Sequence, residues 1–134
     1  MISFVVPGEP QGKGRARATK TGRMYTPTKT KAYETQVAWL ARDAMGVMPA
    51  YGGPLRLRIE AVHGVPPSWP KKRREAAIAG ETAHTSRPDI SNIVKAIEDG
   101  MNGVVYRDDS QIVLLVARKR YGENPRVEVE VSEL

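Results

Sequence analysis

Acidic residues gather in one short stretch of a chain that is basic overall. Five of the fifteen carboxylates fall within residues 89–109, where the only basic residues are Lys95 and Arg107. The five are Asp89, Glu98, Asp99, Asp108 and Asp109. Because the whole chain carries a formal charge of +6, this cluster opposes the charge of the rest of the molecule. Such a cluster is a candidate site for chemistry on a phosphate.

A divalent cation between these carboxylates and a phosphate would reconcile an acidic site with a basic protein. Hard oxygen ligands suit Mg²⁺ or Mn²⁺. The ion would orient a water nucleophile, polarise the scissile phosphate and neutralise the leaving oxygen. Lys95 follows Asp89 at about two helical turns and could stabilise charge in the transition state. The pattern indicates metal-dependent phosphodiester hydrolysis without an organic cofactor.

Each acid also has a purely structural interpretation. Asp89 could be the cap or first-turn acid of a helix, where the helix dipole favours a negative charge. The segment 108–110 could be only a turn. Glu98 and Asp99 are expected to be solvated helix positions.

Basic residues gather near the N-terminus. Residues 8–31 contain seven Lys and Arg residues against one acid, Glu9, with glycines interspersed. This composition predicts a flexible basic loop whose cations could neutralise the phosphates of a nucleic acid. The candidate DNA-binding residues are Lys13, Arg15, Arg17 and Arg23, with a second group at Lys71, Lys72, Arg73 and Arg74. For both groups the alternative is an exposed, solvated face.

The remaining composition excludes several other kinds of site. Cysteine is absent, which rules out a disulfide framework and a cysteine-bearing zinc site. The two histidines, His63 and His84, have no paired ligand motif, so we expect each to be structural or solvent-facing. Neither a signal peptide nor an apolar stretch of membrane-spanning length is evident. We therefore expect a cytoplasmic protein without a membrane partner.

Hydrophobic periodicity predicts one α+β domain over residues 1–134. Alternating or β-rich runs predict strands at 2–6, at 55–60 with continuation to Val62 or His63, at 112–120 and at 127–131. Apolar residues at helical spacing predict helices at 28–45, 71–79 and 88–101. This order predicts a mixed or antiparallel sheet with helices packed mainly on one face.

The acidic stretch carries a recognisable pattern. It consists of Arg87-Pro-Asp-Ile-Ser-Asn-Ile-Val-Lys95, Asp99-Gly-Met-Asn-Gly103 and Val105-Tyr-Arg-Asp-Asp-Ser-Gln-Ile112. Together these segments resemble the RusA family of Holliday junction resolvases, whose hallmark is Pro-Asp-x-Asp-Asn-x-x-Lys followed by Asp-Asp-x-Gln. The resemblance extends more loosely over nearly the whole chain.

The resemblance implies a Mg²⁺-dependent endonuclease, with Mn²⁺ able to substitute, that resolves four-way junction DNA in recombination and repair. It implies that Asp89 and Asp109 are metal-binding catalytic carboxylates, that Lys95 is the catalytic lysine and that Asp108 is an adjacent metal-supporting acid. It also implies a homodimer, whose two sites cut opposing strands, and a bacterial or phage origin.

Ser91 departs from the family pattern, which has a second aspartate at this metal-binding position. An extended Asp-x-Asp pair directs both carboxylates to one side, whereas Ser91 offers a neutral hydroxyl. We expect weaker metal binding unless Asp108, or Glu60 on a neighbouring strand, supplies the charge. An alternative function is therefore a non-catalytic branched-DNA-binding protein. A third, an RNA-binding or ribosome-associated basic domain, leaves the acidic cluster unexplained.

Overall fold

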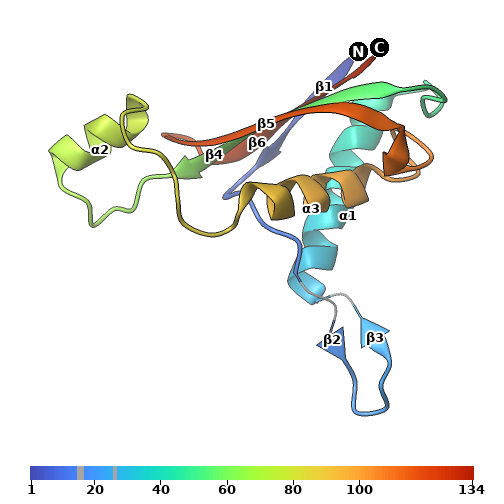
Figure 1. Ribbon diagram of the computed structural model, residues 1–134, viewed down its shortest axis with the longest axis horizontal. Helices are drawn as coiled ribbons and strands as arrows, with labels where there is room; N and C mark the ends of the chain where they lie inside the picture. The colour runs from blue at the N-terminus through green and yellow to red at the C-terminus, as the bar shows by residue number, and fades with distance from the viewer. Residues whose placement is uncertain (15–16, 26) are drawn as a thin grey trace.

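The computed structural model describes residues 1–14, 17–25 and 27–134, and of Arg17 and Tyr25 only the backbone. Its strands are β1 (Ile2–Pro7), β2 (Arg17–Ala18), β3 (Met24–Tyr25), β4 (Leu55–Gly64), β5 (Ile112–Gly122) and β6 (Arg126–Glu133). Its helices are α1 (Thr28–Met45), α2 (Lys71–Ile78) and α3 (Ile90–Met101), with a 3-10 turn, η1 (Asp109–Gln111), before β5 (Figure 1). The predicted α+β class is confirmed.

Four strands form one mixed sheet in the order β1-β6-β4-β5. The β1–β6 and β6–β4 pairs are antiparallel, whereas β4 and β5 run parallel. Parallel neighbours need a crossover connection, and here the crossover contains α2, α3 and η1. The fold therefore brings the whole acidic stretch, residues 89–109, back beside the β4–β5 edge of the sheet.

Alternation along the strands separates a buried face from an open one. Every second residue of β1 is buried, and the same holds for Val127, Val129 and Val131 on β6. Helices α1 and α3 lie on this side of the sheet, while α2 lies beyond one end (Figure 1). The prediction of helices mainly on one face is confirmed by α1 and α3.

A close approach between α1 and α3 fixes the position of α3. A Cβ atom added at Gly100 of α3 would lie 2.6 Å from both Cβ and Cγ1 of Val37 on α1. Side-chain carbons do not approach this closely, so the contact needs a residue without a Cβ. The placement of Lys95, which lies on the same helix, follows from this contact.

A short hairpin lies within the stretch that was expected to be a loop. Strands β2 and β3 pair antiparallel, and the amide of Thr19 donates to the carbonyl of Arg23 at 2.7 Å. The Thr19 hydroxyl oxygen in turn accepts from the Arg23 amide at 3.1 Å. The hairpin projects from the body of the molecule beyond the start of α1 (Figure 1).

The helix predicted at 88–101 begins at Ile90 instead, and Asp89 is its N-cap residue with extended backbone angles. Within the described residues, no helix is both long enough and apolar enough to cross a membrane.

Candidate active site

Asp89 presents an exposed carboxylate at the start of α3. Its Oδ2 accepts from Ser91 Oγ at 3.0 Å, and its Oδ1 accepts from Asn92 Nδ2 at 2.8 Å. The Ser91 hydrogen bond, with smaller contributions from Asn92 and the charge of Lys119, lowers the pKa of Asp89. Asp89 is the N-cap residue of α3, as the structural interpretation expected, but its side chain makes no capping hydrogen bond to the helix backbone. Its ionised oxygens face solvent, where a ligand can reach them.

Lys95 on α3 contacts Asp109, which belongs to the Asp-Asp-x-Gln part of the motif. Its Nζ lies 3.4 Å from Oδ2 of Asp109 at the start of η1 and 3.1 Å from Oδ1 of Asp99, one turn along the helix. The pKa of Lys95 is raised, chiefly by the hydrogen bond to Asp99. The structure thus brings together Lys95 and Asp109, which the resemblance implied to be catalytic, although they lie fourteen residues apart in the sequence.

Asp99 is a structural ion-pair residue, so the expectation that it is solvated is wrong. Its Oδ2 lies 2.9 Å from Nζ of Lys13, which also contacts Glu34 on α1. Burial alone would raise the pKa of Asp99, but the hydrogen bonds from Lys13 and Lys95 outweigh burial and lower it. Lys13, predicted to bind DNA, therefore already ties the basic segment to α1 and α3.

Asp108 shapes the turn that carries Asp109. Its Oδ2 accepts from the Ser110 amide at 3.0 Å, and this hydrogen bond lowers the pKa of Asp108. The turn interpretation is therefore correct for Asp108. Its proposed support of a metal stays a prediction.

Gln111 anchors this turn to a distant loop. Its Oε1 accepts from the amides of Arg107 and Asp108 at 2.9 and 3.2 Å. Its Nε2 donates to the carbonyls of Tyr51 and Gly53 at 2.8 and 3.1 Å. The glutamine of the Asp-Asp-x-Gln pattern thus fixes the position of the preceding aspartates, a role that the sequence did not predict.

Glu98 adds a partly buried acid next to this group. Burial raises the pKa of Glu98, and the nearby charges of Asp109 and Asp99 raise it further. The carbonyl of Glu98 accepts from the hydroxyl of the fully buried Tyr106 at 2.7 Å. Glu98 is therefore only partly solvated, in contrast to the fully solvated position that the sequence predicted.

The acids do not form a ready-made metal cage. Within the parts of the chain that the structure describes, no three Asp, Glu, His or Cys side chains are grouped closely enough to hold a metal ion. Asp89 lies about 9 Å along the helix axis from Lys95, which contacts Asp109. In chemistry the donors fit Mg²⁺, because this ion takes hard oxygen ligands, often binds only one or two carboxylates and keeps several waters. The family resemblance implies that Asp89 and Asp109 would hold it, and this assignment stays a prediction.

Glu60 does not supply the missing charge beside Ser91. It alternates with the buried residues of β4 and therefore points to the open face of the sheet. There its Oε1 lies 2.5 Å from Nη2 of Arg118 and 2.5 Å from Nε of Arg120. The suggestion that Glu60 compensates for Ser91 is wrong.

A basic groove borders Asp89. The groove has a volume of about 1220 Å³, and its lining includes Lys13, Lys29, Arg87 and Asp89. The Lys13 amide donates to the Asn92 carbonyl at 3.0 Å, which holds the N-terminal segment alongside α3. Basic side chains therefore line the groove next to the candidate catalytic carboxylate of Asp89.

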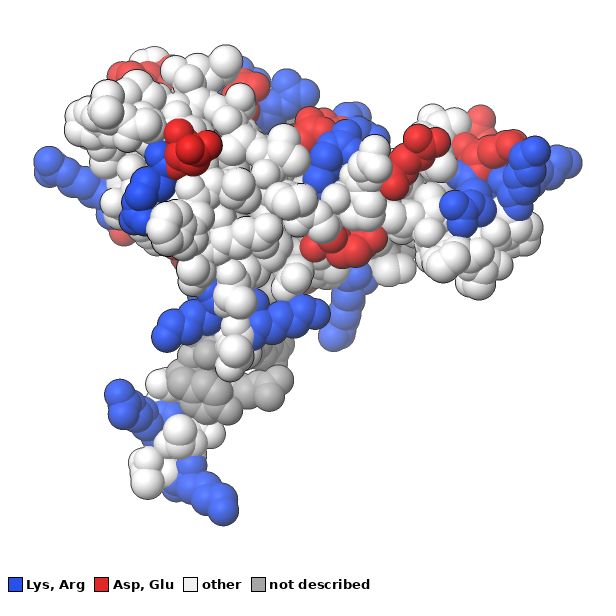
Figure 2. Space-filling view, turned by 180° about the vertical axis from the view of Figure 1, so that it is seen from behind, with Lys and Arg blue, Asp and Glu red and all other residues white. Residues whose placement is uncertain are grey.

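The other predicted DNA contacts lie on two separate projections. Of these, Arg23 is exposed on the hairpin, as is Lys20, which was not among the predicted contacts, and Figure 2 shows basic side chains there. Arg15 lies outside the described residues, as does the side chain of Arg17. On α2, Lys71 and Lys72 are exposed. The Arg73 guanidinium lies 3.6 Å from the centre of the Trp69 ring. Arg74 Nη1 donates to the Pro66 carbonyl at 3.5 Å.

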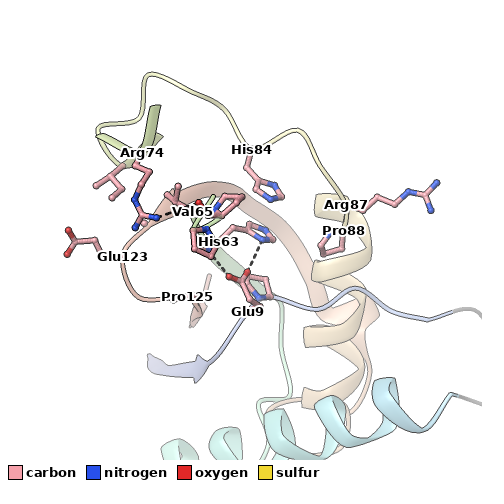
Figure 3. Close-up of a pocket in the computed structure, with 15 residues that line it drawn as sticks. Glu9, His63, Val65, Arg74, His84, Arg87, Pro88, Glu123 and Pro125 are labelled. Atoms are coloured by element: carbon pink, nitrogen blue, oxygen red, sulfur yellow. Dashed lines mark hydrogen bonds and ion pairs between the residues drawn. The ribbon is translucent and has the colours of Figure 1, made fainter. Parts of the chain in front are cut away.

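The two histidines lie together in a second cavity of about 810 Å³ at the end of the sheet (Figure 3). The ring of His63 stacks on that of His84 at 3.7 Å, and Nδ1 of His63 lies 3.5 Å from Glu9 Oε2. Burial lowers the pKa of His63 and of His84 to about 4. The expectation of structural histidines is confirmed for the buried His63.

The chain is similar to known proteins over most of its length. Over residues 7–132 the chain matches the family described as endodeoxyribonuclease RusA. It is 36% identical over 138 residues to the uncharacterized protein YqaN of Bacillus subtilis (strain 168), covering 99% of this chain and 96% of the relative. It is also 47% identical over 51 residues to the crossover junction endodeoxyribonuclease rusA of Lactococcus phage r1t, covering 37% of this chain and 39% of that protein. Because the family match spans most of the chain, this protein belongs to the RusA endodeoxyribonuclease family.

Proposed function

We propose that this protein is a Holliday junction resolvase that hydrolyses DNA phosphodiesters with the help of Mg²⁺ or Mn²⁺. The contact between Lys95 and Asp109, 3.4 Å apart, is the main support for the proposal, because it joins the two halves of the motif. Asp89 of the same motif lines a basic groove. Family membership and the similarity to the phage relative, which is named a crossover junction endodeoxyribonuclease, support the substrate class. A role in recombination and repair follows from that substrate.

Each residue of the candidate active site has a separate role in the proposed reaction. A bound metal would orient the attacking water and stabilise charge on the phosphate. Asp89 keeps an exposed carboxylate ionised at the edge of the groove. Lys95 keeps its ammonium charged between Asp99 and Asp109, where it can stabilise developing negative charge. Asp108 and Gln111 hold the turn that carries Asp109.

We propose further that the protein works as a homodimer, because symmetric resolution needs two nicks. Strand β5 is an edge strand, and four consecutive apolar residues on it, Val113–Val116, are 44–61% exposed. A second copy covering this edge would remove both the apolar surface and the unpaired backbone groups from water. Sedimentation of the protein alone should show the dimer, and a monomer at all concentrations would contradict it.

The first test is cleavage of a labelled four-way junction and a matched duplex, with and without Mg²⁺ or Mn²⁺, resolved on a denaturing gel. We expect paired nicks in the junction alone and only with metal. Asp89→Asn should abolish cleavage while leaving junction binding unchanged or tighter. Asp43→Asn, which neutralises an exposed acid on α1, is the matched control and should cut normally. Unchanged cutting by Asp89→Asn would remove Asp89 from the mechanism.

A non-catalytic junction binder is the second candidate. It is favoured by Ser91 and by the lack of a three-acid group among the described residues. Selective junction binding without metal-dependent nicks would establish it. Equal binding to junction and duplex would contradict both candidates.

A further inference from the structure

The segment that leads into Asp89 is fastened to the sheet by a lysine of β5. Nζ of Lys119 donates to the carbonyl of Ser86 at 2.7 Å and to the carbonyl of Pro88 at 3.0 Å. The Pro88 carbonyl belongs to the peptide group that joins Pro88 to Asp89. Lys119 therefore holds the peptide plane immediately before the candidate catalytic carboxylate.

Strand register explains why this lysine, and not its neighbour, reaches the segment. Lys119 pairs with Ala61, which is fully buried on the helix-covered side of the sheet. Arg118 pairs with Glu60, which points to the open face and binds the Arg118 guanidinium. Adjacent side chains of a strand point to opposite faces, so Lys119 is directed toward the start of α3.

Asp89 depends on this attachment more than the other catalytic candidates do. Within the described part of the chain, the hydrogen bonds to its carboxylate come from Ser91 and Asn92, both in its own helical turn. Those bonds orient the carboxylate relative to the helix, not relative to the sheet. Lys95 lies further along α3, where the helix packs on α1. Lys119 thus acts on Asp89 separately from the contact between Lys95 and Asp109.

A second attachment keeps the rest of the segment in place. His84 stacks on His63 at 3.7 Å and meets the ring of Tyr121 edge-on at 4.9 Å, as Figure 3 shows for the two histidines. These contacts do not involve Lys119. A protein without the Lys119 ammonium should therefore keep its fold and loosen mainly between Ser86 and Asp89.

We propose that Lys119 is a positioning residue for catalysis: it binds the Ser86 and Pro88 carbonyls and so places Asp89 against the scissile phosphate. This inference rests on the proposed nuclease function. Misplacing a catalytic group by about 1 Å can cost about a hundredfold in rate, so a small shift of this segment has a large kinetic effect.

The test replaces Lys119 with methionine, which keeps the length of the side chain and removes its donors. Lys119→Arg restores donors to both carbonyls. Arg118→Met is the matched control, because it removes the same charge from the adjacent position on the opposite face. Amide hydrogen exchange of residues 84–92 is measured on the metal-free proteins, and single-turnover junction cleavage and junction affinity are measured separately.

For Lys119→Met we expect faster exchange confined to residues 86–92, cleavage slowed at least tenfold and an affinity within about threefold of wild type. Lys119→Arg should recover most of both losses, and Arg118→Met should match wild type. Unchanged exchange, or a loss of affinity as large as the loss of cleavage, would overturn the positioning role. If the wild-type protein does not cut the junction, the proposed function fails, while the exchange measurement still decides whether Lys119 holds the segment.

Discussion

Ser91 is the residue at which this chain departs from the Pro-Asp-x-Asp-Asn-x-x-Lys motif. Its hydroxyl donates to the carboxylate of Asp89 at 3.0 Å and thereby takes up one of the oxygens that a metal would use. A hydroxyl brings no charge to a cation, whereas an aspartate would bring a full negative charge at the same place. In the proposed site, position 91 would therefore offer a metal a polar but uncharged group beside Asp89.

We predict that Ser91→Asp lowers the Mg²⁺ concentration needed for half-maximal cleavage several-fold. The added carboxylate raises the negative charge of the site and supplies a hard oxygen ligand. A Mg²⁺ titration of single-turnover cleavage measures this change. Ser91→Ala, which removes the hydrogen bond without adding charge, is the control and should not lower that concentration. An unchanged Mg²⁺ requirement in Ser91→Asp would show that this position is not a ligand.

At the scale of the elements, α3 carries the site and its packing on α1 sets its place. We predict that Gly100→Ala lowers the free energy of unfolding by about 1–3 kcal/mol, the usual cost of overpacking. The new Cβ would lie 2.6 Å from Val37, which outweighs the gain in helix propensity. Urea denaturation measures the change. Gly52→Ala, where nothing lies within 4 Å of an added Cβ, should be close to neutral. Equal stability of Gly100→Ala and wild type would mean that the helices can separate freely.

The β2–β3 hairpin is the element that we expect to contact DNA outside the groove. Replacing both Lys20 and Arg23 with glutamine should weaken junction binding and reduce the slope of log K against log salt by about two. The physical reason is the loss of two phosphate contacts and of the counterions that each releases. Arg42→Gln, an exposed change near the other end of α1, should leave the slope unaltered. A slope that does not change in the hairpin variant would place the DNA elsewhere.

For the molecule as a whole, the stacked histidines link stability to pH. The folded protein holds the pKa of His63 and His84 near 4, against 6.5 for ordinary histidine, so the unfolded chain binds more protons between these values. Stability should therefore be full above pH 6.5 and should fall as the pH drops toward 4. Thermal unfolding across this range measures the effect. His84→Phe, which keeps an aromatic ring and removes one titrating group, should flatten the dependence, and an equally steep curve would exclude the pair as its source.

Local patterns predicted most of the secondary structure. A strand or helix with one buried face has apolar residues at a regular spacing along its own sequence. This spacing is visible as alternation in 55–60 and 127–131, and as a helical period in 28–45 and 90–101. The β2–β3 hairpin was missed because strands of two residues are too short to show a period.

The motif likewise predicted Asp89, Lys95 and Asp109 from their spacing, but not the residues that position them. Lys119 and Gln111 act on backbone carbonyls that lie between 31 and 60 residues away in the sequence. Such contacts depend on the parallel register of β4 and β5 and on the path of the crossover. The spacing of residues along the chain predicts neither the strand register nor the path of the crossover.

The same register also placed Glu60 on the open face and Lys119 on the face that bears the site. The motif along the chain was sufficient to predict a phosphodiester-cleaving chemistry and to name Asp89 and Asp109 as candidate carboxylates. The side of the sheet on which each charge lies, and which carboxylates share a lysine, arose from packing between distant segments. Neighbouring positions in the sequence impose almost no constraint on contacts of that kind.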